Sequence, residues 1–484
     1  MSNATQSVAA ARIDSLLDAN SFVEIGQAVT ARTTDFNMTE KKAPSDGVIT
    51  GYGVIDGSLV YVYSQDASVL NGTVGEMHAK KIAKIYDLAL KVGAPVIGLV
   101  DCAGLRLQEA TDALEAFGEI YLKQTLASGV VPQITAVFGT CGGGMAVVPA
   151  LTDFTFVEEK KGRLFVNTPN ALEGNRVEKC DSASAQFQSE ETGLVDGIGT
   201  EEEILGQIRT LVSMLPENNE DNDSFKECTD DLNRVCDDIA GCTGDTAIAL
   251  SRIADNGEFF ETKAAYGQDV VTGFLRLNGA TVGAVANRSE SYDADGNKTE
   301  VSDGTLSSRG ARKAAEFVKF CDAFEIPVLT LVNVDGYKNC KCNEKKIAKA
   351  AARLTYAFAN ADVPKVTVVV GKANGTAGLT MNSKSIGSDI VYAWKNAKIG
   401  VMEAAPAVKI MYADEIAKAD NAAALINEKA AQYNEMQASA LAAAKRGYVD
   451  DIIEASETRQ RVVAAFEMLF TKREDRPSKK HGTI

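Results

Sequence analysis

The stretch VPQITAVFGTCGGG at residues 131–144 returns as VPKVTVVVGKANGT at residues 363–376, with six identical residues in fourteen positions. A second stretch, GAPVIGLVDCAGL at 93–105, returns as EIPVLTLVNVDGY at 325–337, and both pairs are 232 positions apart. Repetition of this kind is typical of a chain built from two copies of one structural unit. Each copy is therefore expected to carry a related site.

A third pair of segments, GVITGYGVIDG at 47–57 and DVVTGFLRLNG at 269–279, is 222 positions apart. The second copy therefore has about ten extra residues between these segments, and the polar stretch around Tyr292 to Asp303 is the expected place. The polar, acidic stretch 217–225 is typical of a linker, and an Asp-rich helix is expected after it, as far as Cys242.

Short, β-branched apolar runs at 95–100, 133–139, 327–332 and 365–371 predict strands buried on both faces. Amphipathic segments at 79–93 and 311–325 predict helices that come before the strands at 95–100 and 327–332. Alternation of strand and helix favours an α/β fold made of βαβ-type units. Further helices are expected at Asp414–Arg446 and Ser456–Lys472, packing against a neighbouring subunit or domain.

Bulk composition excludes several classes of protein. The net charge of −16 argues against nucleic-acid binding, which needs Lys and Arg to neutralise phosphates. No apolar run approaches the length of a membrane span, and residues 1–10 lack the pattern of a secretory signal. Nine irregularly spaced cysteines suit reduced thiols in the cytoplasm. Cys340 and Cys342 form a CxC pair with no second thiol or His pair at ligand spacing, so no metal or redox role is expected.

Glycine-rich turns follow the repeated strands. GTCGGGM at 139–145 and GKANGTAGL at 371–379 each lead from a strand into a helix-compatible stretch, and the start of a helix favours negative charge. Alone, each segment is compatible with a simple tight turn, and the spacing of a phosphate loop is absent. Two such turns at equivalent places predict two anion-stabilising sites. The positions that correspond in the two copies are Gly143 and Gly375, Gly144 and Thr376, and Met145 and Ala377.

An earlier turn in each copy adds to this prediction. DCAGLR at 101–106 and NVDGYK at 333–338 each follow a buried strand and place a glycine near the next strand's turn. Backbone N–H groups around these glycines would supply the second donor of an oxyanion hole. The expected donors are at Gly104, Leu105, Gly336 and Tyr337.

Side chains that could act as acid or base are scarce. The chain has two histidines, of which His78 is expected to be structural and His481 exposed. Neither a Gly-x-Ser-x-Gly elbow nor a zinc-ligand set is present. We therefore expect chemistry that depends on backbone polarisation, with a substrate or cofactor moving the protons.

Four segments carry a family resemblance: SDGVITGYGVIDG (45–57), EMHAKKIAKIYDLA (76–89), GTCGGGMAVVPALTDF (139–154) and RGYVDDIIEASETR (446–459). They resemble the β-type carboxyltransferase subunits of biotin-dependent acyl-CoA carboxylases and decarboxylases, the propionyl-CoA carboxylase β and methylmalonyl-CoA decarboxylase α family. The resemblance covers nearly the whole chain. It implies two tandem crotonase-like domains of the ββα superhelix type, related by internal duplication, at 1–230 and 231–484. It also implies a hexamer arranged as a trimer of dimers.

The resemblance implies a transfer of a carboxyl group between carboxybiotin and a short-chain acyl-CoA, with propionyl-CoA and methylmalonyl-CoA as the expected substrates. In such sites the N-terminal turn stabilises the thioester enolate. By position, its donors are Gly143 and Gly144, with Gly104 and Leu105 assisting. The C-terminal turn stabilises the ureido oxygen of biotin. By position, its donors are Thr376 and Ala377, with Gly336 and Tyr337 assisting. Leu379 stands near the acyl pocket, where propionyl-type enzymes tend to carry Asp.

Partners follow from what the sequence lacks. It has no Met-Lys-Met biotinylation site and no ATP-binding lid, so the biotin carboxyl carrier protein and a biotin carboxylase, or a membrane decarboxylase subunit, are expected to be separate chains. The bulk of Thr376 and Leu105 departs from the family pattern and leaves the acyl substrate open.

Three other functions remain open. One is the carboxyltransferase subunit of a sodium-pumping decarboxylase of the methylmalonyl- or glutaconyl-CoA type. Another is a crotonase-like hydratase or isomerase, which needs carboxylates beside the first glycine turn. Glu109, Glu115 and Glu119 are close in sequence, but a solvated helix face is expected for them. The third is a non-catalytic assembly subunit that has lost one oxyanion hole.

Overall fold

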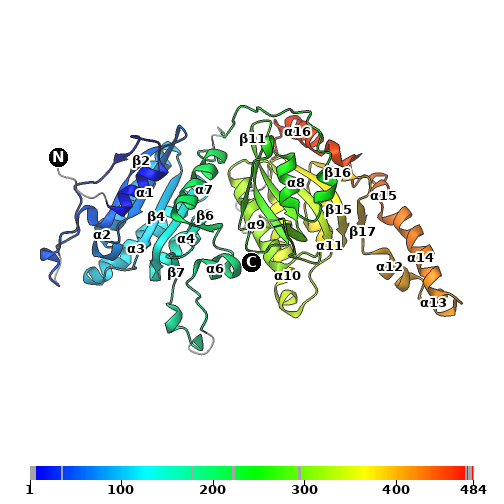
Figure 1. Cartoon of the computed structure of the whole chain (residues 1–484), viewed down its shortest axis with the longest axis horizontal. Coiled ribbons are helices and arrows are strands. Elements are labelled where there is room, and N and C mark those ends of the chain that lie inside the picture. The colour runs from blue at the N-terminus through cyan, green and yellow to red at the C-terminus, as the bar shows by residue number, and fades with distance from the viewer. Residues whose placement is uncertain are drawn as a thin grey trace. The chain divides into compact units, whose positions relative to one another are not determined.

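The computed structural model describes residues 7–33, 36–175, 179–220, 224–292 and 296–474, together with 477 and 482. The chain forms two compact units, Met1–Ser224 and Phe225–Ile484 (Figure 1). The sequence placed the division between residues 230 and 231. Within the described ranges, no helix is long and apolar enough to cross a membrane.

The first unit is built on one mixed sheet of eight strands. Strands β1, β2 and β3 are antiparallel, and the strands from β3 onward are parallel. The sheet order is β1 (Val23–Glu24), β2 (Val48–Ile55), β3 (Ser58–Gln65), β4 (Val96–Cys102), β5 (Gln133–Gly142), β6 (Phe154–Glu158) and β8 (Gly197–Gly199), with β7 (Arg163–Phe165) also paired to β5. As predicted, β4 and β5 are buried for most of their length.

Helices cover this sheet (Figure 1). They are α1 (Val8–Leu16), α2 (Glu76–Val92), α3 (Ala110–Ala127), α4 (Val148–Leu151), α6 (Ala185–Phe187) and α7 (Glu201–Met214). The amphipathic segment predicted at 79–93 is α2, which packs against α3 and ends at Gly93 with a φ of +75°. Glycine adopts this left-handed conformation without the steric cost that a Cβ brings, and so it ends the helix there.

The second unit repeats this sheet strand for strand. Its order is β9 (Phe259–Thr262), β10 (Val270–Leu277), β11 (Ala280–Asn287), β14 (Val328–Asp335), β15 (Lys365–Asn374), β16 (Ile390–Trp394) and β18 (Asp451–Ile453), with β17 (Lys398–Gly400) also paired to β15. Even the register agrees, since Val48 pairs with Gln65 in one unit and Val270 with Asn287 in the other. The internal duplication predicted from the sequence is therefore present in the fold.

Helices of the second unit are α8 (Thr246–Ile253), α9 (Ser308–Ala323), α10 (Lys341–Asn360), α11 (Gly375–Thr380), α12 (Ala404–Met411), α13 (Ala413–Lys418), α14 (Ala422–Tyr433), α15 (Ala440–Ala444) and α16 (Thr458–Leu469). The segments predicted as helices at 311–325 and 456–472 correspond to α9 and α16. The small hairpin of β12 (Glu290–Tyr292) and β13 (Lys298–Glu300) falls where the ten extra residues were expected.

Two helix predictions need correction. The stretch 414–446 is not one helix, because α13 stops at Lys418 and α14 starts anew where the Asn421 side chain accepts the N–H of Ala424. The Asp-rich piece leading to Cys242 has one short 3₁₀ turn at Ile239–Cys242, and its other described residues are irregular. The Asp230 side chain in this piece pairs both with Arg234, four residues along, and with Arg459 of α16, far along the chain.

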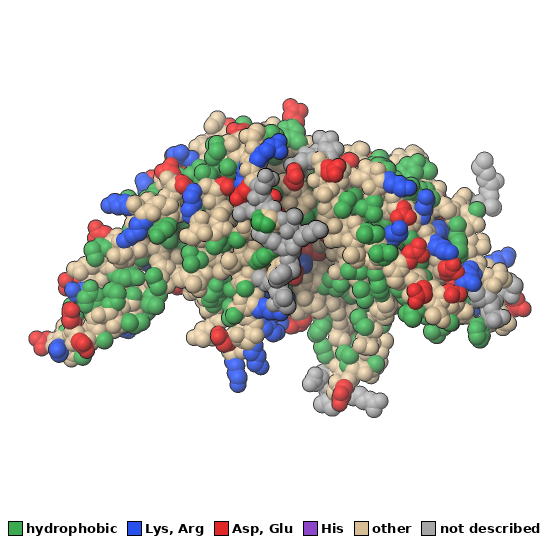
Figure 2. Space-filling model, turned by 180° about the vertical axis from the view of Figure 1, so that it is seen from behind, with side chains coloured by type: hydrophobic (Ala, Val, Ile, Leu, Met, Phe, Trp, Pro, Cys, Tyr) green, Lys and Arg blue, Asp and Glu red, His purple; other side chains and the backbone are tan. Residues whose placement is uncertain are grey.

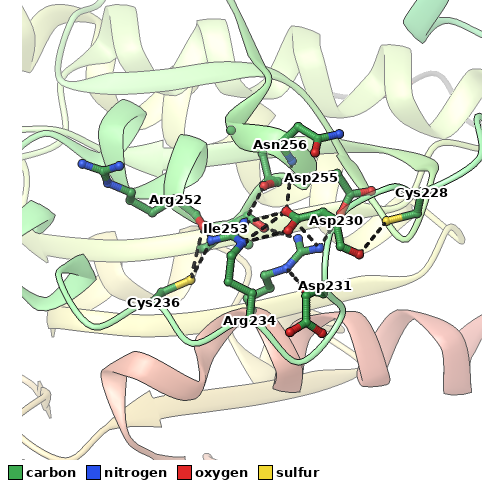
Figure 3. Close-up of polar contacts among 12 residues, drawn as sticks. Cys228, Asp230, Asp231, Arg234, Cys236, Arg252, Ile253, Asp255 and Asn256 are labelled. Carbon is green, nitrogen blue, oxygen red and sulfur yellow. Dashed lines mark hydrogen bonds and ion pairs between the residues drawn. The ribbon is translucent and has the colours of Figure 1, made fainter.

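Asp230 of this piece and Asp255, further along the chain, form a buried polar cluster around Arg459 of α16. Arg459 donates to the carbonyl oxygen of Ile253 at 2.6 Å and to Asp255 at 2.7 Å. Asp230 lies 3.5 Å from the same guanidinium and also binds Arg234 at 2.9 Å (Figure 3). The hydrogen bond from Arg234 lowers the pKa of Asp230 to about 2. The cluster fastens α16 to the irregular segment at the start of its own unit.

Helices α12, α13 and α14 project from the second unit as an arm beyond its sheet (Figure 1). Hydrophobic side chains gather on this arm (Figure 2). The large exposed ones along it and beside it are Val401, Met402, Ile410, Met411 and Met436. Exposed apolar area of this kind marks an interaction surface.

Candidate active site

The first glycine turn lies where β5 ends at Gly142 and a 3₁₀ turn, η5 (Gly143–Val147), begins. Gly143 has a φ of +61°, and a Cβ added to it would meet no atom within 4 Å. No side chain caps this helix start. Since the first N–H groups of a helix have no partner inside it, the turn brings helix-start amides beside open space, as an anion site requires.

Helix α3 contacts this first glycine turn through a hydrogen bond and through ring packing. The Tyr121 hydroxyl donates a hydrogen bond to the carbonyl oxygen of Gly144. A Cβ on Gly144 would lie 3.1 Å from that hydroxyl and 3.1 Å from the ring of Phe117. Gly144 is therefore packed closely, while Gly143 faces free space. Tyr121 was not predicted as a site residue, although it lies in the helical segment before the repeated strand.

Gly104 lies beside this turn, as predicted, because a Cβ added to it would come within 3.3 Å of the Gly142 carbonyl oxygen. The N–H of Gly104 already faces the sulfur of Cys102 at 3.3 Å. Val74 donates to the carbonyl oxygen of Gly104 at 2.9 Å. Leu105 is therefore the better placed of the two predicted assisting donors.

The second unit has the same backbone arrangement. Strand β15 ends at Asn374, and α11 starts at Gly375 with a φ of +64°. Gly336 has a φ of +91°, and a Cβ on it would meet nothing within 4 Å. Leu306 donates to the Gly336 carbonyl oxygen at 2.9 Å, which repeats the contact between Val74 and Gly104 at positions 232 later. Tyr337 bridges to Leu306 as Leu105 bridges to Val74.

Each pair of turns is tied together by one side chain that the sequence analysis missed. Asp101 accepts the N–H of Thr140 at 3.2 Å, and a Cβ on Gly139 would collide with its carboxylate at 2.1 Å. In the second unit, Asn333 accepts the N–H of Lys372 at 3.0 Å. The constant offset between the copies was the available signal, since these contacts also lie 232 positions apart.

A charged group beside the second turn has no counterpart in the first. Lys372 donates to Asp335 at 2.8 Å and pairs with Glu403 at 2.5 Å, and Asn374 donates to Asp335 at 2.7 Å. Partial burial raises the pKa of Asp335, but the hydrogen bonds from Asn374 and Lys372 outweigh it and lower the pKa overall. The two turns therefore have the same backbone conformation but differ in the charged side chains around them.

A cavity of about 530 Å³ opens at the second turn. Gly375, Thr376 and Leu379 line it together with Tyr433, Arg446 and Tyr448. Thr376 is exposed and Ala377 buried, so the two residues predicted to act together differ in access. Leu379, 46% exposed, lines the same cavity as Thr376.

The prediction of a solvated helix face is wrong for Glu109, whereas Glu115 is exposed as predicted. Glu109 is 4% exposed, pairs with Arg106 at 2.8 Å and accepts the N–H of Glu76 at 2.7 Å. Asp46 binds the same guanidinium. A cation inside the fold draws the carboxylate inward, because an unpaired buried charge is costly. Both oxygens of the Glu109 carboxylate therefore have partners inside the fold.

His78 is structural, as predicted. It is fully buried, its Nδ1 lies 2.9 Å from the carbonyl oxygen of Asp46, and its Nε2 faces the Gln65 amide at 3.1 Å. Burial, with the nearby Arg106 charge, lowers the pKa of His78 to about 3. His481 lies outside the described residues. Within the residues that the structure describes, no group of three or more His, Cys, Asp or Glu side chains could hold a metal ion.

Comparison with known proteins places this geometry in a family. Residues 2–484 match the family model of the carboxyl transferase domain. The chain is 40% identical to methylmalonyl-CoA decarboxylase subunit alpha of Propionigenium modestum and 41% identical to the carboxyltransferase subunit of propionyl-CoA carboxylase of Haloferax mediterranei. Each of these alignments covers 98% of this chain and 92% of the relative.

Comparison with solved structures identifies the same family. A crystal structure of transcarboxylase 12S, with methylmalonyl-CoA and methylmalonic acid bound, superimposes with a TM-score of 0.91 at 36% identity, covering 98% of this chain and 91% of that one. The two repeated sheets are accordingly two crotonase-like domains. The protein belongs to the carboxyl transferase family.

Proposed function

We propose that this protein is a transferase that moves a carboxyl group between carboxybiotin, carried on a separate protein, and a short-chain acyl-CoA of the propionyl-CoA and methylmalonyl-CoA type. The observation that carries the proposal is the pair of glycine turns with the same backbone geometry, at Gly143 and Gly375, in a chain of this family. A carboxyl transfer passes through two oxygen anions, one on each reacting partner, and two amide-lined turns suit that need.

The first turn would hold the acyl-CoA thioester. Gly143 and Gly144 would donate to the carbonyl oxygen of the thioester as it becomes an enolate, with Leu105 and Gly104 beside them. Open space at Gly143 leaves room for that oxygen, and the Tyr121 contact keeps the turn in place. Each such donor contributes about 2.7–4 kcal/mol of transition-state stabilisation in well-studied cases.

The second turn would hold biotin. The residues present fit it, since Gly336 borders open space and Gly375, Thr376 and Leu379 line a cavity of about 530 Å³. Thr376 and Ala377 would donate to the ureido oxygen, assisted by Gly336 and Tyr337. Carboxybiotin, when bound, supplies the carboxyl group and a nitrogen base for the α-proton. This role of the cofactor is consistent with a first turn near which the carboxylates of Asp101 and Glu109 both have partners, since Asp101 accepts the N–H of Thr140 and Glu109 is held in an ion pair with Arg106.

The remaining assignments follow from the same proposal. Residues 1–230 and 231–484 are the N- and C-terminal carboxyltransferase domains. The protein acts in the cytoplasm, together with a biotin carboxyl carrier protein and a biotin carboxylase. Transcarboxylase 12S is described as a hexamer assembly, and the apolar arm of α12–α14 supports a hexamer here too, as a trimer of dimers.

A decarboxylase subunit is the second candidate, because relatives named methylmalonyl-CoA decarboxylase subunit alpha are as similar as the carboxylase subunits. Its partner would be a membrane decarboxylase subunit in place of the biotin carboxylase. Isolation of the native complex distinguishes the two. A multi-span membrane protein in the complex supports the decarboxylase, and an ATP-dependent biotin carboxylase supports the carboxylase.

The direct test uses the purified full chain with methylmalonyl-CoA and either free biotin or a biotinylated carrier domain. We expect CO₂ release that depends on biotin and is greater with the carrier. A parallel sample with crotonyl-CoA measures hydration and addresses the hydratase alternative. Absence of biotin stimulation with malonyl-CoA and methylmalonyl-CoA alike would contradict the proposed function.

A further inference from the structure

The CxC pair lies at the first turn of α10, a helix of 20 residues. Cys340 is the N-cap residue, and Cys342 is the second residue of the helix. Their sulfur atoms are 2.9 Å apart. Cys342 is exposed and Cys340 is partly exposed, so solvent and small molecules reach the pair. No metal or redox role was expected for the pair from its spacing, but the side-chain geometry indicates a redox role.

Two sulfur atoms at this distance are closer than an ordinary non-bonded contact and longer than the S–S bond of about 2.05 Å. Because the two residues are two apart at the start of one helix, closing a disulfide requires adjustment of their own side chains and of one turn of backbone. The two thiols are therefore close enough to form a disulfide after a small local adjustment.

The surroundings favour a thiolate. The neighbouring Cys342 thiol, with the N–H groups of Asn343 and Cys342, lowers the pKa of Cys340 below its ordinary value. Residues 338–349 carry five lysines and one glutamate in a chain whose net charge is −16. Positive charge and a helix N-terminus both stabilise a thiolate, the form that attacks disulfides.

The other described thiols differ. Cys102 and Cys141 face each other in register on β4 and β5, but burial raises the pKa of both, that of Cys102 to about 11. Cys321 is also buried, and burial raises its pKa. Cys180 is exposed like Cys342 but has no neighbouring cysteine in its sequence segment. Cys180 is thus a matched reference for an unpaired thiol.

Asn343 connects the pair to the predicted donor loop. Its side chain donates to the Lys338 carbonyl oxygen at 2.8 Å and accepts the N–H of Ser308 at 2.7 Å. Its own N–H donates to the Cys340 carbonyl oxygen at 3.0 Å. Lys338 directly follows the loop of Gly336 and Tyr337. A change at the first turn of α10 thus reaches that loop through one buried side chain.

We propose that Cys340 and Cys342 form a redox-active dithiol, which small-molecule disulfides of the glutathione type convert to an intrachain disulfide that tightens the first turn of α10. The Cys340 thiolate attacks the disulfide RSSR, forms a mixed disulfide and releases one RS⁻. Cys342, as a thiolate, then attacks the Cys340 sulfur, forms the ring and releases the second RS⁻. The two thiol protons go to the two RS⁻ ions, and two electrons pass from the protein to RSSR.

The test titrates the full-length reduced protein with mixtures of reduced and oxidised glutathione, blocks free thiols and maps them by mass spectrometry. Trypsin cleaves after Lys338, Lys341 and Lys345, so the disulfide keeps the peptides NCK and CNEK joined. We expect this joined species, two hydrogen atoms lighter than the two peptides, at glutathione ratios that leave Cys180 reduced.

Variants separate pairing from simple reactivity. Cys180→Ser should leave the joined species unchanged, whereas Cys342→Ser should abolish it and leave Cys340 carrying glutathione. The proposal is overturned if the two residues stay as free thiols, or each carries its own glutathione, at ratios where Cys180 is already modified. Amide hydrogen exchange should also slow at the first turn of α10 on oxidation, and an unchanged rate there would contradict the tightening. Any effect of the disulfide on the rate of carboxyl transfer rests on the proposed function. Formation of the disulfide itself does not, so the thiol mapping tests this inference independently of the proposed function.

Discussion

The hydroxyl group of Tyr121 donates a hydrogen bond to the carbonyl oxygen of Gly144 and so ties α3 to the first glycine turn. The peptide that follows Gly144 cannot rotate without breaking this bond. The neighbouring amides of the turn therefore keep their direction before any substrate binds. Such preorganisation is the main way in which backbone donors lower a barrier.

Removal of this hydrogen bond should raise the catalytic barrier by more than it lowers the free energy of unfolding. In Tyr121→Phe we expect turnover to fall on the order of tenfold, which corresponds to about 1.4 kcal/mol in the barrier. Stability should change by about 1 kcal/mol, as for one ordinary hydrogen bond. Steady-state rates of biotin-dependent CO₂ release and urea unfolding measure the two effects. The control Tyr292→Phe removes an exposed hydroxyl elsewhere, and equal slowing of both variants would contradict a positioning role.

Substitution at Gly143 should block the first turn. The methyl group of Gly143→Ala would enter the open space where the thioester oxygen is proposed to bind. We expect turnover to fall on the order of 10²-fold, comparable to the loss of one oxyanion donor. The positive φ adds strain of about 1 kcal/mol, and Gly143→Val would add more because its side chain is branched at Cβ.

Gly174→Ala is the matched control for this strain. Gly174 also has a positive φ, +81°, and also faces open space. The two alanine variants should lose similar stability in thermal unfolding, while Gly174→Ala keeps its turnover. If Gly143→Ala retained full activity, the first turn would not be the thioester site.

The buried His78 should make the protein sensitive to acid. Its native pKa is about 3, and the ordinary value is 6.5. Between these values the unfolded chain binds a proton that the native state does not, so stability is lost as pH falls from 6.5 toward 3. The slope approaches about 1.4 kcal/mol per pH unit. Urea unfolding at ~pH 7 and ~pH 5 measures it.

His78→Gln should reduce that slope while retaining a donor for Asp46 and an acceptor for Gln65. The chain's other histidine, His481, provides the control, since the sequence predicts an exposed side chain there. His481→Gln should leave the slope unchanged. An identical pH dependence in wild-type protein and His78→Gln would show that His78 is not the acid-sensitive group.

Arg459 should be essential for the stability of the second unit. It is fully buried, and Arg459→Met would leave the carboxylate of Asp255 buried beside an uncharged side chain. Breaking such a pair costs about 3–5 kcal/mol. Arg461→Met is the control, because Arg461 is 47% exposed and its ion pairs are at 3.6 and 3.7 Å. Exposed pairs contribute about 0–1 kcal/mol, so comparable losses in both variants would contradict this account.

Most of the fold could be predicted because its elements carry local signals. Strands β4, β5, β14 and β15 are continuous apolar runs, and α2 and α9 have one apolar face. The failures lie where side chains bind far along the chain. Asp230 and Asp231 contact Arg459 of α16, more than two hundred positions away, and no local pattern reveals this.

The candidate site was predictable to the same extent. The four glycines at Gly104, Gly143, Gly336 and Gly375 indicate turns, because glycine readily adopts a positive φ. All four have a positive φ in the structure. Asp101, Tyr121 and Glu109 gave no such signal. An acidic residue or a tyrosine near a turn has the same sequence appearance whether it faces water or binds a buried partner.

The sequence by itself determined the duplication, the alternation of strands and helices within each copy and the positions of the two glycine turns, because periodicity and backbone freedom belong to the chain. Tertiary structure alone decided which amides have partners and which carboxylates are buried. These properties depend on distances between side chains set by packing. The free energy of a buried charge or an unpaired amide depends on its neighbours in space and not on its neighbours in sequence.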